Sequence, residues 1–224
     1  MSQLAVEVMG VTKVYRSGGV ETAALRGVDL TVEVGGFVAL AGPSGSGKTT
    51  LLNLIGCLDR PTGGQIKVGG QVTTGLSANR RADFRAQSIG FVFQSLNLIP
   101  VLTVLENVEL PLLLHGVPAA ERRRRATGLV AAVGLAGKTR RRPSELSGGE
   151  QQRVAVARSL VTRPAVVLAD EPTASLDSAT GVAIIEVMRQ LNREYGATFL
   201  FATHDPIVVE RVDRVVRLRD GQVV

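Results

Sequence analysis

The sequence predicts an α/β protein with a parallel-sheet core, an antiparallel β region at its N-terminus and an α-helical subdomain inserted into the chain. Short, continuously apolar runs such as Phe37–Ala41 and Val166–Asp170 are typical of strands buried on both faces of a sheet. Helical stretches separate these runs, and such alternation favours parallel pairing. Between residues 103 and 160 the pattern becomes mostly helical, and this stretch forms the predicted insert.

The N-terminal part of the chain carries the antiparallel elements. Residues 4–15 and 28–34 alternate loosely between apolar and polar side chains, and paired glycines follow each run. A shorter strand pair is predicted over 65–72, with Gly69 and Gly70 at its turn.

The remaining elements follow in chain order. A helix is predicted over 48–56 and a buried strand over 89–93. Thr103 and Glu106 form a capping box that begins a helix, which Pro111 is expected to kink or end. The later elements are helices over about 118–133, 148–160 and 178–194, and strands over 166–170, 198–203 and 215–218.

Composition limits the class of protein. The 224 residues are 45% hydrophobic and 21% charged, which is ordinary for a globular chain with one core. No apolar run approaches the ~20 residues that cross a bilayer, and no secretory signal is visible at the start. The single cysteine, Cys57, fits a reducing compartment and is interpreted as a buried packing residue rather than a reactive thiol.

The net charge is +6, and basic residues gather in 122–125 and 138–142. Such runs allow a nucleic-acid or anionic-membrane surface, but a solvated helix face and a charged loop are the simpler interpretation. Aromatic residues make up only 4% and do not alternate with the arginines, so no base-stacking platform and no nucleic-acid partner are expected.

Residues 42–49 match the phosphate-loop pattern G-x-x-x-x-G-K-[ST] between a predicted strand and a predicted helix. The glycines let consecutive N–H groups wrap a phosphate, and the helix N-terminus adds positive potential. Lys48 is expected to bridge the β- and γ-phosphates and Thr49 to bind Mg²⁺. The residues predicted to hold the nucleotide here are Gly42, Pro43, Ser44, Gly45, Ser46, Gly47, Lys48, Thr49 and Thr50.

Two adjacent acids, Asp170 and Glu171, follow the apolar strand that begins at Val166. In a chain with a phosphate loop, Asp170 can hold Mg²⁺ through water and Glu171 can accept a proton from an attacking water. The phosphate loop and these acids together predict hydrolysis or transfer of a nucleoside triphosphate.

A second helix start that favours anions lies about a hundred residues after the phosphate loop. Ser147 and Glu150 form a capping box, and Gly148 and Gly149 leave the first N–H groups of the helix uncovered. The chain therefore offers two phosphate-seeking helix starts.

In this order, the motifs resemble the ATP-binding cassette (ABC) ATPases, the motor subunits of ABC transporters, which have a P-loop NTPase (RecA-like) core. The segment 146–151 is similar to the signature sequence of that family, and the resemblance covers essentially the whole chain. It implies one nucleotide-binding domain over 1–224. The α/β core would take about 1–94 and 163–224, and the helical subdomain about 95–162.

The resemblance also implies roles for residues that carry little signal alone. Gln94 resembles the glutamine that reaches Mg²⁺ and the attacking water, and His204 resembles the switch histidine that contacts the γ-phosphate. Tyr15 lies where the family places an aromatic that stacks on adenine, and residues 175–177, ending in Asp177, resemble the D-loop. Each residue also has a structural alternative, since Tyr15 could be a core aromatic and His204 a helix-cap or core histidine.

Family members of this kind pack head to tail, so the resemblance implies a homodimer around two ATP. Ser147, Gly148, Gly149 and Glu150 would then face the γ-phosphate held by the other copy. The implied activity is ATP hydrolysis with Mg²⁺, in a cytoplasmic subunit held at the inner face of the membrane by a separate permease.

Residues 54–64 and 89–111 are similar to the ABC group that exports lipoproteins, macrolides and peptides and includes the cell-division ATPase. The loop 94–100 is the expected socket for the permease, although its apolar residues could instead belong to the core. The stretch after Thr173 lacks the Gly-Asn pair common in this group. An importer subunit for amino acids or similar solutes, a mechanical-signalling ATPase in cell division and a soluble ABC ATPase acting on nucleic acid stay open as alternatives.

Overall fold

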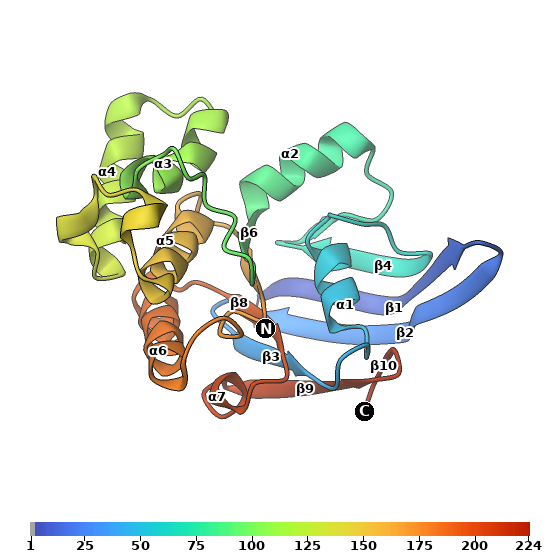
Figure 1. The fold of residues 1–224 in the computed structure, drawn as a ribbon. Coiled ribbons are helices and arrows are strands. Elements are labelled where there is room, and N and C mark those ends of the chain that lie inside the picture. The colour runs from blue at the N-terminus through green and yellow to red at the C-terminus, as the bar shows by residue number, and fades with distance from the viewer. Residues whose placement is uncertain (1–2) are drawn as a thin grey trace.

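The computed structural model describes residues 3–224, and it places a mixed sheet between an antiparallel sheet and a group of helices (Figure 1). The antiparallel sheet has the strand order β2-β1-β4-β5. Its strands are β1 (Leu4–Ser17), β2 (Val20–Glu33), β4 (Gly63–Val68) and β5 (Gln71–Val72). The predicted antiparallel region is confirmed.

The strand β2 begins well before the predicted start at residue 28. The register between β1 and β2 shifts where Val11 pairs with Val28 and Thr12 with Arg26, which leaves Gly27 as an extra residue at φ +82°. Such a bulge interrupts the period-two alternation on which the prediction depended.

The core sheet has six strands in the order β10-β9-β3-β8-β7-β6. Its strands are β3 (Phe37–Ala41), β6 (Ile89–Val92), β7 (Val166–Asp170), β8 (Phe199–Thr203), β9 (Arg214–Arg219) and β10 (Gln222–Val223). All pairs are parallel except β9 with β10. The predicted parallel core is therefore confirmed, with one short antiparallel strand at its edge.

Seven α-helices complete the described part of the chain. They are α1 (Lys48–Ile55), α2 (Ala78–Ser88), α3 (Val104–Leu114), α4 (Ala119–Ala132), α5 (Gly148–Leu160), α6 (Ser178–Tyr195) and α7 (Pro206–Val209). In the chain, α3, α4 and α5 lie between β6 and β7, and they gather on one side of the molecule (Figure 1).

Both predicted capping boxes, at Thr103 and at Ser147, are formed. Pro111 does not end its helix, because α3 continues to Leu114, and the alternative of a kink stays a prediction. Pro111 cannot donate to the Asn107 carbonyl oxygen, and the helix continues for only three residues beyond it. The helix α2 was not predicted, since Phe84 is its only buried residue and it has no apolar stripe.

The core sheet is buried on both faces, and its strands alternate between two hydrophobic clusters. In β3, Phe37 and Ala39 join the cluster built with α3 to α6, whereas Val38 and Leu40 join the cluster built with α1 and the antiparallel sheet. A strand covered on both faces needs apolar residues throughout, which explains its unbroken apolar sequence.

The end of α5 approaches the edge strand β6 with no side chain between them. A Cβ atom built on Gly90 would lie 2.2 Å from the Ser159 carbonyl oxygen, so this position in β6 requires glycine. The contact places the last turn of α5 directly against the strand that leads to Gln94.

Replacing Gly90 with alanine should lower the free energy of unfolding by about 1–3 kcal/mol, because backbone cannot move away from the new methyl group without repacking. Urea denaturation measures the change. The control is Gly128→Ala in α4, where a Cβ meets no atom within 4 Å and alanine should stabilise the helix by about 0.5–1 kcal/mol. Equal effects of the two substitutions would contradict the packing argument.

Candidate functional site

The candidate site lies at the carboxyl ends of three neighbouring parallel strands. The phosphate loop follows β3, the paired acids end and follow β7, and His204 follows β8. Because β8 lies between β3 and β7, the loops that leave these strands meet at one edge of the sheet. Ala41 pairs with Thr203 and Asp170 with Ala202, so the strands end nearly level.

The phosphate loop has the backbone that its glycines permit. Gly45 and Gly47 adopt φ values of +81° and +104°, a region that favours glycine. A Cβ on Gly42 would lie 2.1 Å from the Leu218 carbonyl oxygen, so strand β9 holds the start of the loop in place. The buried Ser46 Oγ has no hydrogen-bond partner, which leaves a polar atom available inside the loop.

Lys48 is the first residue of α1, and its side chain reaches back to the start of the phosphate loop. Its side chain is 7% exposed, and its ammonium donates to the carbonyl oxygens of Gly42 at 2.7 Å and Pro43 at 3.0 Å. The loop therefore concentrates one buried positive charge where the α1 N-terminus adds its own positive potential. This arrangement fits a phosphate group.

Thr49 and Asp170 bring together the oxygen atoms that a magnesium site needs. The Thr49 hydroxyl donates to Asp170 Oδ1 at 3.1 Å. Burial raises the pKa of the Asp170 carboxyl, and the neighbouring Glu171 adds to that rise while Thr49 and Lys48 oppose it. Oxygen ligands are the ones that Mg²⁺ prefers, and a nearby divalent cation favours the ionised carboxylate. The residues present therefore fit the ion.

Glu171 is held from two sides. Its backbone adopts φ +44°, Thr203 Oγ1 donates to its Oε2 at 2.8 Å, and His204 Nδ1 lies 2.7 Å from its Oε1. Thr203 is completely buried, whereas the His204 side chain is 64% exposed. The carboxylate thus has one fixed partner and one partner that solvent or a ligand can reach.

The structure places Gln94 close to this group without joining it. Gln94 is exposed and comes two residues after Val92, which pairs with Ala169 next to Asp170. Asp177 is the N-cap of α6, where Thr180 N donates to its Oδ1 at 3.0 Å. Hydrogen bonds from Thr180 lower the pKa of the Asp177 carboxyl. The predicted roles of Gln94 and Asp177 stay predictions.

Tyr15 stands on β1 beside the first turn of α1, where it shares a hydrogen bond with Thr50. It is 41% exposed, and its hydroxyl donates to Asp59 Oδ2 at 3.0 Å. The Lys13 ammonium lies 4.6 Å from the ring centroid. Burial and Asp59 raise the pKa of the phenol. The ring is therefore a fixed surface aromatic and not a core residue.

Among residues 3–224, no hydrogen bond or ion pair joins the side chains of the signature segment to the phosphate loop. Ser147 Oγ accepts from Glu150 N at 3.3 Å, and Glu150 also bonds Lys138. A Cβ on Gly149 would lie 2.4 Å from Thr180 Cγ2, so the neighbours of the segment are the first residues of α6. Ser147 and Gly148 are exposed at the N-terminus of α5.

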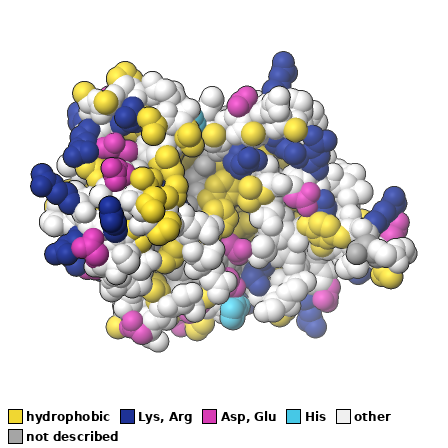
Figure 2. Space-filling view, turned by 45° about the horizontal axis from the view of Figure 1, so that its top comes forward, with side chains coloured by type: hydrophobic (Ala, Val, Ile, Leu, Met, Phe, Trp, Pro, Cys, Tyr) yellow, Lys and Arg dark blue, Asp and Glu magenta, His cyan; other side chains and the backbone are white. Residues whose placement is uncertain are grey.

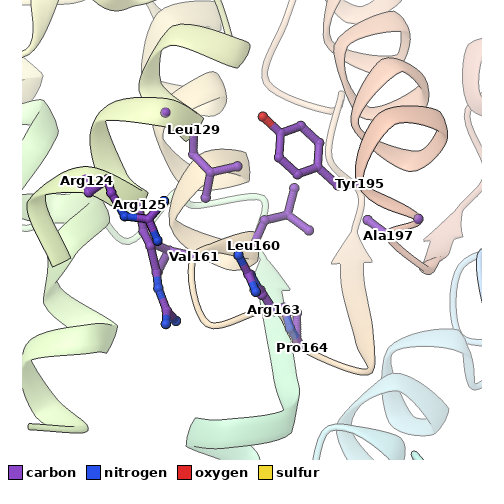
Figure 3. Close-up of a pocket in the computed structure, with 11 residues that line it drawn as sticks. Arg124, Arg125, Leu129, Leu160, Val161, Arg163, Pro164, Tyr195 and Ala197 are labelled. Atoms are coloured by element: carbon purple, nitrogen blue, oxygen red, sulfur yellow. The ribbon is translucent and has the colours of Figure 1, made fainter. Parts of the chain in front are cut away.

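A cavity of about 530 Å³ lies at the opposite end of the core strands and belongs to neither part of the site. Figure 3 shows Arg124, Arg125 and Arg163 around an apolar floor that includes Leu129 and Leu160. The last turns of α5 and α6 border this cavity, and arginines complement the negative potential of helix C-termini.

Residues 3–224 contain neither a cluster of metal-binding acids, histidines and cysteines nor a membrane-spanning helix. No cluster of three His, Cys, Asp or Glu side chains there is suited to hold a metal ion. No helix in the same range is long and apolar enough to cross a membrane.

Sequence reasoning missed two polar residues at the site. Thr203 holds the Glu171 carboxylate, and Asp205 bonds Thr173 and caps α7. The position of Thr203 at the end of a buried strand, directly before His204, was the available signal. A buried threonine at that point needs a hydrogen-bond acceptor.

Comparisons with known proteins agree with this geometry. The family model described as "ABC transporter" matches residues 25–174. The chain is 50% identical over 220 residues to the lipoprotein-releasing system ATP-binding protein LolD of Anaeromyxobacter dehalogenans, covering 98% of the chain and 92% of that protein. It is 47% identical over 218 residues to the macrolide export ATP-binding/permease protein MacB of Syntrophobacter fumaroxidans, covering 96% of the chain but only 30% of MacB.

A solved structure gives the same result. The dimeric, post-hydrolysis state of the ATP-binding cassette MJ0796 bound to ADP and Pi matches with a TM-score of 0.86 and 44% identity, covering 97% of this chain and 96% of that one. The chain therefore belongs to the ABC transporter family, as one of its ATP-binding and ATP-hydrolysing components.

Proposed function

We propose that the chain is the ATPase motor of an exporter-like transporter, and that two copies close head to tail around two ATP molecules. The proposal depends on one observation: the two candidate phosphate-binding segments of the chain, the phosphate loop and the signature at the start of α5, lie apart from each other. The phosphate loop and the acids share the edge of the sheet, whereas Ser147 and Gly148 are exposed at the start of α5, next to α6. A second copy in the opposite orientation supplies the missing half to each site. The related cassette MJ0796 is described as dimeric.

In this proposal residues 42–50 surround the phosphates, Lys48 bridges the β- and γ-phosphates, and Tyr15 covers the adenine. Ser147, Gly148 and Gly149 of the other copy approach the γ-phosphate, with Glu150 and Asp177 at the junction between the copies. Backbone N–H groups at two helix N-termini and one buried ammonium then neutralise the triphosphate. The division into an α/β core and a helical subdomain over about 95–162 belongs to the same proposal.

Hydrolysis in the proposed mechanism depends on Glu171 as general base. Thr203 fixes one carboxylate oxygen, which leaves Oε1 to accept a proton from the attacking water when His204 turns toward the γ-phosphate. Gln94 orients that water. A Mg²⁺ ion held by Thr49, Asp170 and Gln94 would neutralise charge on the phosphates.

The permease is proposed to dock in an apolar groove of about 430 Å³ beside the loop 94–100. Figure 2 shows hydrophobic side chains gathered along a hollow on this face, with basic side chains on both sides. The residues lining the groove include Leu58, Phe91, Phe93, Asn97, Leu110 and Leu114. A groove of this character fits an amphipathic helix from a partner.

The names of two relatives support export rather than import. LolD belongs to a lipoprotein-releasing system, and MacB combines the ATP-binding part with a permease for macrolide export. By analogy, the chain acts at the inner face of the membrane with a separate permease.

Replacing Glu171 with glutamine should reduce ATP hydrolysis by about 10²-fold or more while the ATP-bound dimer persists, because the general base is lost and the phosphate contacts stay. Light scattering coupled to size exclusion measures the dimer, with ADP as the control ligand. A Glu171→Gln protein that stays monomeric at saturating ATP would falsify the head-to-tail model.

Replacing Tyr15 with alanine should weaken ATP binding by about tenfold or more, because stacking of an aromatic on a base contributes about 1–3 kcal/mol. A titration with a fluorescent ATP analogue measures the affinity. Tyr15→Phe is the matched control, since it keeps the ring and loses only the hydroxyl with its bonds to Asp59 and Thr50. If the alanine and phenylalanine variants bind equally well, the ring does not stack on adenine.

Replacing Leu114 with aspartate should abolish recovery of the permease with the tagged protein from membranes, because docking would bury an unpaired carboxylate in the groove. Leu114 is 75% exposed at the end of α3. The control is Val20→Asp, which adds the same charge at a 66% exposed valine of β2 and should not disturb docking. Undiminished recovery with the Leu114 variant argues that the permease binds elsewhere.

A further inference from the structure

Arg158 connects the signature helix directly to the loop that follows Gln94. The helix α5 runs from Gly148 to Leu160, so its first turn carries the signature and its last turn carries Arg158. The Arg158 guanidinium donates to the carbonyl oxygens of Asn97 at 2.6 Å and Leu96 at 2.8 Å. A helix of this length spans about 20 Å, so Arg158 links the loop after Gln94 to a signature that lies about that far away.

The loop that Arg158 holds has an unusual backbone. Leu96 and Asn97 adopt φ values of +59° and +50°, so two consecutive residues other than glycine are left-handed. Asparagine tolerates this region, but a leucine there is strained. Such strain persists only where the surroundings fix the conformation, and the two carbonyl oxygens of these residues are the acceptors of the arginine.

No acidic side chain in residues 3–224 forms an ion pair with Arg158. Within residues 3–224 its two hydrogen bonds go to these carbonyl oxygens, and no salt bridge involves it. Burial lowers the pKa of its guanidinium. Arg158 and Asn97 both line the groove proposed for the permease. The planar fork of an arginine suits two acceptors, which a lysine ammonium cannot engage in the same geometry.

We propose that Arg158 is a positioning residue that transmits the nucleotide state of the signature end of α5 to the loop 94–97 and its docking groove. The inference rests on the proposed dimer, because there the other copy supplies the phosphate that reaches the signature. When α5 is displaced, the guanidinium of Arg158 moves with it. Because the guanidinium is hydrogen-bonded to the carbonyl oxygens of Leu96 and Asn97, the loop moves as well. Gln94 and the groove-lining residue Asn97 both belong to the segment that is moved.

Hydrogen exchange of the loop 94–100 tests this coupling in the Glu171→Gln background, with and without ATP. In that background we expect ATP to slow exchange in the loop. Adding Arg158→Gln should speed loop exchange by about tenfold or more, since each hydrogen bond from a charged donor can shift an opening equilibrium by that factor. The loop should also stop responding to ATP while the dimer still forms.

Arg124→Gln is the control, since it removes an arginine whose side chain is 70% exposed in α4 and should leave the loop unchanged. Arg158→Lys keeps the positive charge but lacks the planar guanidinium, so its loop should also stop responding to ATP. This variant replaces Arg158→Gln in the experiment if circular dichroism shows that the glutamine variant is unfolded. A loop that still responds to ATP in a dimeric Arg158 variant overturns the coupling. If the Glu171→Gln protein itself does not dimerise with ATP, the head-to-tail proposal is overturned. Faster exchange of the loop in the Arg158 variant would then still show that Arg158 holds the loop in place.

Discussion

The hydrogen-bonded register of β3, β8 and β7 is the constraint on which the site depends. These strands end almost level, and the phosphate loop, the paired acids Asp170 and Glu171, and the Thr203–His204 pair lie at their carboxyl ends. Thr203 reaches Glu171 only because β8 lies beside β7 in this register. A one-residue slip of either strand would turn the corresponding side chain into the opposite hydrophobic cluster.

The sheet can hold this register because both faces are covered. The aromatic pairs among Phe37, Phe199 and Phe201 fill the face toward the helices, with ring centroids 4.7 to 5.9 Å apart. The other face packs against α1, which carries Lys48 and Thr49 in its first turn. The same burial that stabilises the strands therefore fixes the phosphate loop and the acids relative to each other.

Helix α5 joins the remaining functional surfaces. Its N-terminus exposes Ser147 and Gly148, and its C-terminal turn packs on Gly90 and holds Leu96 and Asn97 through Arg158. One element thus contacts the proposed dimer interface at one end and the proposed permease groove at the other. A helix buried along most of its length can link two such surfaces because its core side chains leave little freedom between the ends.

Local signals in the chain determined the phosphate loop, the capping boxes at Thr103 and Ser147, and the buried strands of the core, because each depends on residues within a few positions of one another. Local signals missed α2, which is mostly charged, and the start of β2, where the bulge at Gly27 broke the alternation. Only the tertiary structure decided that Thr203 and His204 share the Glu171 carboxylate and that Arg158 donates to the carbonyl oxygens of Leu96 and Asn97. It also decided that the signature lies against the first residues of α6. These contacts join residues that lie tens of positions apart in the sequence and that strand order and helix packing bring together. A local sequence pattern covers only a few neighbouring residues, so it cannot predict such contacts.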